Sequence, residues 1–368
     1  MKKSKRLVLT GGHAGGMAYA VIQTLKKNKT PWDIYWIGVK KAVEGGKTET
    51  YESQVFPKLG IKFYAITAGR LQRKFTPFTL VSLMKVPVGF VSAFILLLRI
   101  KPSVVLSFGG YAAFPVVVCA WSLRIPVIIH EQTAAAGRAN IMSALFAKKI
   151  ALARVTSRKY FPSQKIIITG NPLSEDIKKI SIRKTLSNPP RIFITGGSRG
   201  SKTLNDIIFS VIAELVKKYK VVHQTGELSF AEAKIIQKGL GKLSGSYEVW
   251  NFIPPETQHR IMGDSDLVIS RAGATTLSEL TFLKRPCILV PIPFSYLDEQ
   301  TKNARVLEQV GLARIIKQED LSSEALLKNV EEIFSNYSQI KSSIEDSGLN
   351  LDANASELLV KMVEEEVK

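Results

Sequence analysis

The chain has 368 residues, of which 45% are hydrophobic, and these proportions exclude a disordered protein and favour two domains of ordinary size. Cys119 and Cys287 each lie in an apolar run, so we expect buried thiols in a reducing compartment rather than a disulfide or a metal site. The basic start is followed by too short an apolar stretch for a signal peptide, and it predicts a first strand.

The net charge of +20 comes entirely from the first half of the chain. Residues 1–174 contain 26 Lys and Arg against 5 Asp and Glu, whereas the remainder contains 25 against 26. Between Gln54 and Ser174, Glu131 is the single carboxylate among 16 basic residues. A surface with one sign of charge attracts polyanions, so we expect a partner such as nucleic acid, an anionic lipid surface or a diphosphate substrate.

Short apolar runs rich in β-branched residues alternate with helical patterns along the chain. In the first half they predict strands at 6–10, 33–39, 62–66, 104–108, 127–130, 149–153 and 165–170. The pattern starts again after Pro189 and Pro190, with strands at 191–197, 221–226, 247–252, 267–273, 287–293 and 313–316. The helices expected between these are 201–217, 228–238, 255–262, 274–284, 299–310 and 320–335. This alternation predicts βαβ units on parallel sheets.

We therefore predict an α/β protein with two doubly wound, Rossmann-like domains. The expected divisions are an N-terminal domain at 1–174, a linker at 175–190, a C-terminal domain at 191–350 and an amphipathic helix at 351–368 that packs back on the first domain. Each half opens with a strand that runs into a Gly-Gly turn and a helix. Because such sheets bind ligands at the carboxyl ends of their strands, we expect the site in a central cleft that the two domains face.

Polar residues follow the buried strands of the first half. His13 lies in the turn TGGHAGG, where a helix N-terminus can hold an anion and an imidazole can act as a base; a tight turn with a structural histidine is the alternative. Glu131 follows the strand VIIH and stands alone in a basic region. That isolation favours a functional carboxylate over a simple ion pair with a neighbouring Arg.

The second half carries similar turns. In GGSRGS, Ser198 and the amides after it can donate to phosphate oxygens, or Ser198 can cap the helix. In SRAGATTLSEL, the small residues and Thr275 permit close approach of a diphosphate, and Glu279 can accept both hydroxyls of a ribose. Gln300 can bond the hydroxyls of a sugar, with capping of the helix by Asp298 as the alternative.

The sequence shows no pattern of metal ligands. The four histidines have no ligand spacing, and there is no Asp-x-Asp for a sugar-nucleotide metal and no Gly-x-Ser-x-Gly nucleophile elbow. We therefore expect neither a catalytic metal nor a cofactor.

A membrane contact is predicted between residues 71 and 101. The apolar run at 86–98 is too short to cross a bilayer of about 30 Å, and part of it fits a buried core helix. The residues before it mix apolar and basic side chains on what the pattern indicates is an exposed hairpin, which suits an anionic membrane surface; core packing with solvated charges is the alternative. The expected contact residues are Arg73, Lys74, Phe75, Phe78, Leu80, Leu83 and Lys85.

Taken in order, the motifs resemble the MurG family within glycosyltransferase family 28, and the resemblance runs over nearly the whole chain. The motifs that carry it are TGGH at 10–13, FGGYAAFP at 108–115, HEQTAAAGRAN at 130–140, TGNP at 169–172, TGGSRGSKTLND at 195–206, HQTG at 223–226, FIPP at 252–255, ISRAGATTLSEL at 269–280 and DEQTKNA at 298–304. This family moves N-acetylglucosamine from UDP-GlcNAc to lipid I and forms lipid II for peptidoglycan. The resemblance therefore implies an inverting transferase of the GT-B type, peripheral on the cytoplasmic face of the cell membrane.

The resemblance also implies roles for residues. In the donor site, the backbone of Ile253 would read uracil, Glu279 the ribose and Gln300 the GlcNAc hydroxyls. The donor-binding set it implies is Thr10, Gly11, Gly12, Thr133, Ser174, Ser198, Ile253, Ala274, Thr275, Thr276, Leu277, Ser278, Glu279 and Gln300. Thr133 and Ser174 stand where the family usually has Asn and often has Arg. The acceptor site would contain Tyr111, Glu131 and Asn140, with His13 or Glu131 as general base.

Two other interpretations remain open from the sequence. One is a different GT-B enzyme, such as a glycolipid synthase or a UDP-sugar epimerase, and an epimerase would need no membrane affinity. The other is a basic nucleic-acid-binding protein, although the basic half has no recognised nucleic-acid motif and its aromatic residues lie in apolar runs.

Overall fold

The structure is a computed structural model that describes residues 5–12, 14–28, 31–41, 49–69, 77–183, 185–197, 200–345 and 352–367, without the side chains of 77–83 and 345. The chain divides into two compact units, one formed by Met1–Ser174 with Leu351–Lys368 and the other by Glu175–Asn350. Residues 175–190, which the sequence analysis places in a linker, group with the second unit.

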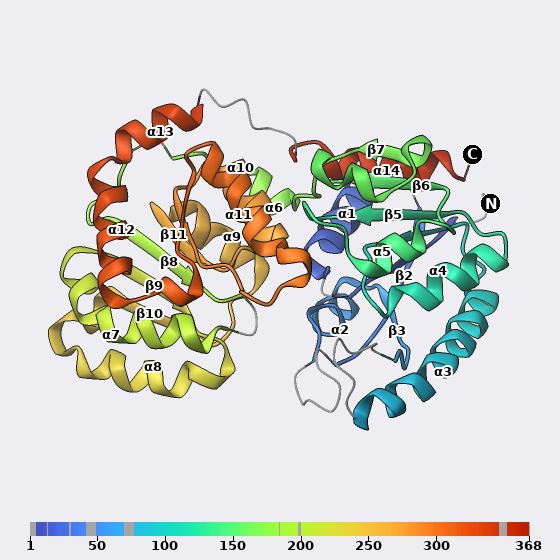
Figure 1. The fold of residues 1–368 in the computed structure, drawn as a ribbon, viewed down its shortest axis with the longest axis horizontal. Helices are drawn as coiled ribbons and strands as arrows, with labels where there is room; N and C mark the ends of the chain where they lie inside the picture. The colour runs from blue at the N-terminus through green and yellow to red at the C-terminus, as the bar shows by residue number, and fades with distance from the viewer. Residues whose placement is uncertain are drawn as a thin grey trace. The chain divides into compact units, whose positions relative to one another are not determined.

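The first unit is built on a parallel sheet (Figure 1). Among its described residues, seven strands lie in the order β3-β2-β1-β4-β5-β6-β7. They are β1 (Lys5–Thr10), β2 (Trp32–Gly38), β3 (Lys62–Ala65), β4 (Val104–Ser107), β5 (Val127–Glu131), β6 (Lys149–Leu152) and β7 (Ile166–Ile168). The central strands are buried on both faces, as their continuous β-branched runs predict. The order reverses direction between β1 and β4, which is where doubly wound sheets bind ligands.

Helices cover both faces of this sheet (Figure 1). They are α1 (Gly15–Lys27), α2 (Tyr51–Val55), α3 (Pro77–Ile100), α4 (Ala113–Ser122), α5 (Arg138–Ser143) and, from the end of the chain, α14 (Ala355–Glu365). The C-terminal segment belongs to this unit because α14 packs on α1 and Asp352 accepts two hydrogen bonds from the Arg154 guanidinium, at 2.7 and 2.9 Å.

Helix α3 differs from the expected hairpin. Residues 77–84 are helical, because Pro77 occupies the first helical position, where its missing N–H is no loss, and the run after it is rich in helix-forming Leu, Met and Lys. Of the predicted membrane residues, Arg73, Lys74 and Phe75 lie outside the described part of the chain, and the side chains of Phe78, Leu80 and Leu83 are not described. Among the helices that are described, none is long and apolar enough to cross a membrane.

The second unit repeats the architecture. Its described residues form a six-stranded parallel sheet in the order β10-β9-β8-β11-β12-β13 (Figure 1). The strands are β8 (Arg191–Thr195), β9 (Lys220–Gln224), β10 (Tyr247–Trp250), β11 (Leu267–Ser270), β12 (Cys287–Leu289) and β13 (Ala313–Ile315). The order here reverses between β8 and β11, so this pair of strands marks the corresponding ligand position.

The helices of the second unit are α6 (Glu175–Lys178), α7 (Lys202–Lys218), α8 (Glu227–Gly239), α9 (Pro255–Asp264), α10 (Ala274–Leu283), α11 (Glu299–Gln309), α12 (Ser323–Ser335) and α13 (Tyr337–Glu345). Six of them, α7 to α12, begin and end within three residues of the expected ranges, whereas α6, in the expected linker, and α13 were not expected. Short 3-10 helices lie at Pro57–Leu59, Val155–Tyr160 and Ser163–Lys165 in the first unit, and at Gly241–Ser246, Tyr296–Asp298 and Gln318–Asp320 in the second. The predicted fold class, two doubly wound α/β domains, is confirmed, and Cys119 and Cys287 are both buried free thiols.

Candidate functional site

In the first unit, two glycine turns meet at the carboxyl ends of β1 and β4. The Gly12 N–H donates to the Gly109 carbonyl at 2.8 Å. A Cβ added to Gly110 would lie only 2.8 Å from the Gly12 nitrogen, and Gly110 has a φ of +91°. The close approach of the two backbones therefore requires glycine there. Thr10 is buried and Tyr111 is partly buried beside these turns, whereas His13 lies outside the described residues.

Glu131 accepts hydrogen bonds from several residues of the loop that follows β5. Its Oε1 accepts from the Thr133 N–H at 3.1 Å and the Thr133 hydroxyl at 2.8 Å. Its Oε2 accepts from the Gly137 N–H at 3.0 Å and the Asn140 amide at 2.9 Å. The side chain is only 2% exposed. Glu131 therefore organises the 131–140 loop, and the side chains of Thr133 and Asn140 are directed into that loop.

Burial controls ionisation around this loop. Burial raises the pKa of Glu131, and its hydrogen bonds with Asn140, Gly137 and Thr133 oppose that rise. Burial lowers the pKa of His130 to about 4, and its Nε2 donates to the Gly170 carbonyl at 3.0 Å. His130 is therefore a neutral core histidine. Ser174, the last residue before α6, is also buried.

In the second unit, the turn after β8 is closely packed. The Gly197 N–H donates to the Thr195 hydroxyl at 3.0 Å, and a Cβ on Gly200 would meet the Thr225 carbonyl at 1.9 Å. Ser201 caps α7 by accepting from the Leu204 N–H. The cap of this helix is thus Ser201 and not Ser198, because the turn continues through Gly200 before the helix begins; Ser198 lies outside the described residues.

Gln224, at the end of β9, joins two parts of this site; it belongs to the HQTG motif of the sequence, but no role was expected for it. Its amide donates to the Gly197 carbonyl at 2.9 Å, and its carbonyl accepts from the Ile253 N–H at 3.0 Å. It is fully buried. Gln224 therefore fixes the turn after β8 relative to Ile253.

Helix α10 starts at the carboxyl end of β11. Ala274, Thr275 and Thr276 are partly buried in its first turn, and Leu277 and Ser278 point into the core. Glu279 lies in the second turn and is 7% exposed, with its Oε1 3.0 Å from Nε2 of His259 on α9.

Gln300 lies in the first turn of α11, after a loop with unusual backbone geometry. Its Oε1 accepts from the Ile292 N–H at 3.0 Å, and its own N–H donates to the Ser295 hydroxyl at 3.2 Å. Leu297 and Asp298 have φ values of +52° and +54°, which are costly for residues other than glycine. Asp298 is the N-cap residue in a left-handed conformation, and Ser295 satisfies the Gln300 N–H in its place.

Arg271 is a second residue that the sequence analysis did not single out. Its guanidinium donates to the Ser201 hydroxyl at 2.6 Å, to the Val290 carbonyl at 3.0 Å and to the Gln318 side chain at 2.8 Å. It therefore ties the cap of α7 to the ends of β11 and β12. The signal in the sequence is a polar residue at the carboxyl end of a buried strand: Arg271 directly follows β11, and Gln224 is the last residue of β9.

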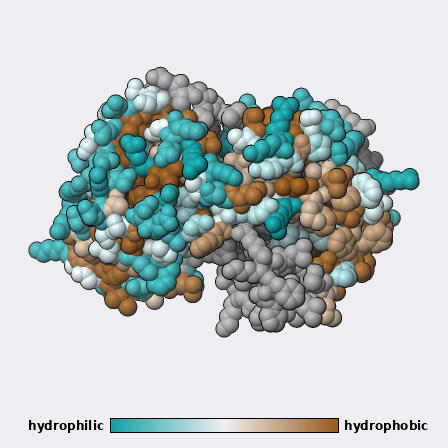
Figure 2. Space-filling view, in the orientation of Figure 1, coloured by the Kyte–Doolittle hydropathy of each residue, from teal (hydrophilic) through white to brown (hydrophobic). Residues whose placement is uncertain are grey.

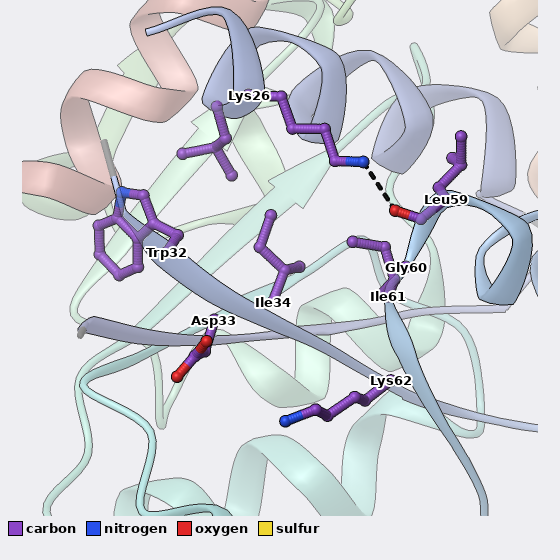
Figure 3. A pocket seen from close by; sticks show the side chains of 9 residues that line it. Lys26, Trp32, Asp33, Ile34, Leu59, Gly60, Ile61 and Lys62 are labelled. Atoms are coloured by element: carbon purple, nitrogen blue, oxygen red, sulfur yellow. Dashed lines mark hydrogen bonds between the residues drawn. The ribbon is translucent and has the colours of Figure 1, made fainter. Parts of the chain in front are cut away.

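A cavity of about 150 Å³ lies elsewhere in the first unit (Figure 3). Trp32, Ile34, Leu59 and Ile61 line it, and Lys26 bridges its rim by donating to the Leu59 carbonyl at 2.7 Å. These residues lie at the amino ends of β2 and β3, the opposite sheet edge from the glycine turns. Within the described ranges, no group of three or more His, Cys, Asp or Glu could hold a metal ion.

Comparison with known proteins gives matches to both units. Residues 7–152 match the glycosyltransferase family 28 N-terminal domain, and residues 191–359 match the glycosyltransferase family 28 C-terminal domain. A Bacillus cereus protein is 32% identical over 350 residues, which cover 92% of this chain and 94% of that protein. Its name describes an N-acetylglucosamine transferase acting between UDP-N-acetylglucosamine and N-acetylmuramyl-(pentapeptide) pyrophosphoryl-undecaprenol.

Solved structures share the fold. MurG of Acinetobacter baumannii has a TM-score of 0.66 at 24% identity, covering 98% of this chain and 99% of that one. A Neisseria meningitidis UDP-GlcNAc 2-epimerase, solved with UDP-GlcNAc bound, has a TM-score of 0.67 at 16% identity, covering 98% and 100%. At these identities the structures establish the architecture alone, so the full-length sequence relationship is what separates the two activities.

Proposed function

The chain belongs to glycosyltransferase family 28, and from that premise we propose that it transfers N-acetylglucosamine from UDP-GlcNAc to the C4 hydroxyl of lipid I. The product is lipid II, the lipid-linked disaccharide used for peptidoglycan and hence for cell wall growth, cell shape and division. The observation that carries the proposal is the 32% identity over nearly the whole chain with an enzyme named for this reaction.

The second unit is the proposed donor site. The Ile253 carbonyl, with its N–H held by Gln224, would accept from the uracil, and Glu279 would accept from the ribose hydroxyls. The N-termini of α7 and α10 would face the diphosphate with their backbone N–H groups, which oppose the negative charge that develops as UDP leaves. Gln300 would contact the GlcNAc hydroxyls through its amide nitrogen, because its oxygen accepts from Ile292.

The first unit is the proposed acceptor site. The glycine turns at Gly11–Gly12 and Gly109–Gly110 bring backbone close together at the carboxyl ends of β1 and β4, which suits the approach of a diphosphate. Glu131 holds the following loop through four hydrogen bonds. We assign proton removal from the C4 hydroxyl to His13, because both carboxylate oxygens of Glu131 are occupied by donors of its own loop.

The test is UDP release from UDP-GlcNAc by the purified protein, with and without lipid I in detergent micelles. Release that depends on lipid I supports the proposal, and Glu279→Ala should raise the KM for UDP-GlcNAc about tenfold or more, since hydrogen bonds to a charged group are worth about 1.5–3 kcal/mol. Formation of the 2-epimer without lipid would instead identify an epimerase. Failure to bind UDP-GlcNAc would exclude both.

We also propose that the first unit lies on the cytoplasmic membrane surface through an apolar patch. Its members are exposed large side chains of α3 and of the neighbouring α4 and α5 region, and Figure 2 shows apolar residues gathered on this side of the unit. The patch consists of Met84, Val88, Val91, Phe94, Ile95, Leu98, Trp121, Met142 and Leu145, which are 39 to 75% exposed. Lys85, Arg99, Lys101 and Arg124 lie on or beside the same helices, and they suit anionic headgroups.

The patch gives a direct prediction. Val91→Glu and Leu98→Glu, which lie on one face of α3 and are 58% and 47% exposed, should each weaken binding to vesicles with anionic phospholipid about tenfold, since burying one aliphatic side chain is worth about 1.5 kcal/mol or more. Cosedimentation measures this. The control is Ile235→Glu on α8, which is 72% exposed and should bind like wild type. Equal binding by all three variants would contradict the surface assignment.

A further inference from the structure

His259 and Glu279 form a buried pair in the second unit. The His259 Nε2 lies 3.0 Å from the Glu279 Oε1, and the two residues are only 5% and 7% exposed. They come from different helices, α9 and α10, and are separated by 20 positions in the sequence, so the pair exists only because the fold packs these helices together. The ring nitrogen donates to the carboxylate oxygen.

The pair sets the orientation of Glu279. Burying an isolated carboxylate is costly, and a hydrogen-bonded imidazole on one oxygen offsets that cost and restricts the rotation of the side chain. Because Oε1 accepts the bond from His259, Oε2 is the carboxylate oxygen that would accept hydrogen bonds from a ligand. A vicinal diol requires acceptors in a fixed direction, so an oriented carboxylate binds it better than a mobile one.

The surrounding charges favour a protonated His259. Burial by itself lowers the pKa of His259, but the charge of Glu279, its hydrogen bond and the more distant carboxylates of Asp176 on α6 and Glu256 on α9 outweigh it, so the pKa is raised. The other charged residues of α9 are Arg260, which is exposed, and Asp264, its last residue. A charged donor makes a stronger bond to the carboxylate than a neutral one.

Helix α9, which carries His259, begins close to the proposed base-binding residue. This helix begins at Pro255, two residues after Ile253, whose backbone is the proposed reader of uracil. Helix α10 carries the proposed ribose carboxylate. A bond from His259 to Glu279 therefore joins the element that follows the base site to the element that holds the ribose site.

We propose that His259 is a positioning residue that aims the Glu279 carboxylate at the ribose hydroxyls of a uridine diphosphate. The inference rests on the proposed function, because it takes the donor to be a UDP-sugar. His259 itself touches no substrate in this scheme and acts through Glu279.

The test compares ligands that differ only in the ribose. Calorimetric titration of the full chain with UDP, 2′-deoxy-UDP and 3′-deoxy-UDP should show that wild type prefers UDP about tenfold or more. His259→Leu should lower UDP affinity about tenfold and reduce the preference over the deoxy ligands to less than about threefold, because the oriented acceptor is lost. His259→Gln keeps a donor for Glu279 and should restore most of the preference. Arg260→Gln, on the same helix but exposed, should behave like wild type.

The outcomes distinguish a failure of the His259 inference from a failure of the proposed function. Equal weakening of all three ligands by His259→Leu would assign His259 a purely structural role and overturn the inference, while UDP binding would leave the proposed function standing. Absence of a ribose preference in wild type would also overturn it, since Glu279 would then not read the hydroxyls. No binding of UDP by wild type would remove the proposed function together with the inference. Because the preference is a ratio within each variant, loss of some folded protein changes the stoichiometry and not the result.

Discussion

Replacing His13 by alanine is expected to lower kcat by about 10²–10⁴-fold, the range that a positioned general base contributes. The sequence leaves His13 and Glu131 as candidates for this base. Both oxygens of Glu131 accept hydrogen bonds from Thr133, Gly137 and Asn140, and the side chain is 2% exposed. A carboxylate held in this way is poorly placed to receive a proton from an acceptor hydroxyl, which leaves His13.

The measurement is lipid-I-dependent UDP release at saturating UDP-GlcNAc, over a range of pH. With His13→Ala, the KM for UDP-GlcNAc should stay within about threefold of wild type, because the lost interaction belongs to the transition state and not to donor binding. The limb of the pH–rate profile that reports the base should disappear. A variant with nearly full kcat, combined with a large loss in Glu131→Gln, would move the base to Glu131.

The positions of the strands and of most helices can be predicted from the local hydrophobic pattern of the sequence, as β4 and β5 illustrate. The strands β4 and β5 begin with the apolar runs VVL and VII because both faces of a parallel sheet are covered, and no competing helix period is present. Helix α3 was expected to begin after a hairpin. Its first residues, PFTLVSLM, include no basic side chain but directly follow the basic segment with Arg73 and Lys74, and local sequence does not distinguish this pattern from a surface loop.

The sequence predicts at which strand ends the candidate residues lie, but not the contacts between them. Polar residues after buried strands pointed to the carboxyl ends of β1, β5, β8 and β11. The role of Gln224 depends on Gly197 and Ile253, which lie 27 and 29 positions away in the sequence, and that of His259 depends on Glu279, 20 positions away. Such partners are set by helix and strand packing, so spacing rules for motifs do not reveal them. The loop around Glu131 is the exception, because its three partners follow within nine residues.

Glu131→Ala is expected to lower the free energy of unfolding by about 2–4 kcal/mol, because it leaves buried donors of Thr133, Gly137 and Asn140 without their acceptor. A domain stable by about 5–15 kcal/mol would lose a large part of its margin. Glu131→Gln keeps one acceptor oxygen and should lose less. Urea denaturation followed by circular dichroism measures both, and Ile235→Glu, at a position of α8 that is 72% exposed, is a control expected to stay within about 0.5 kcal/mol of wild type.

The pH dependence of the free energy of unfolding, compared between wild type and Glu131→Gln, tests whether the buried carboxylate costs stability. Because burial raises the pKa of Glu131 in the folded state, protonation favours folding, so this contribution is complete below the ordinary value of 4.5 and is lost as pH rises through the raised pKa. Wild type should therefore lose stability relative to Glu131→Gln across that interval. A carboxylate retained at such a cost must serve the ordered 131–140 loop, and Glu131→Gln should accordingly weaken lipid I use more than UDP binding. Unchanged stability in Glu131→Ala, or an opposite pH trend, would show that the loop does not depend on this carboxylate.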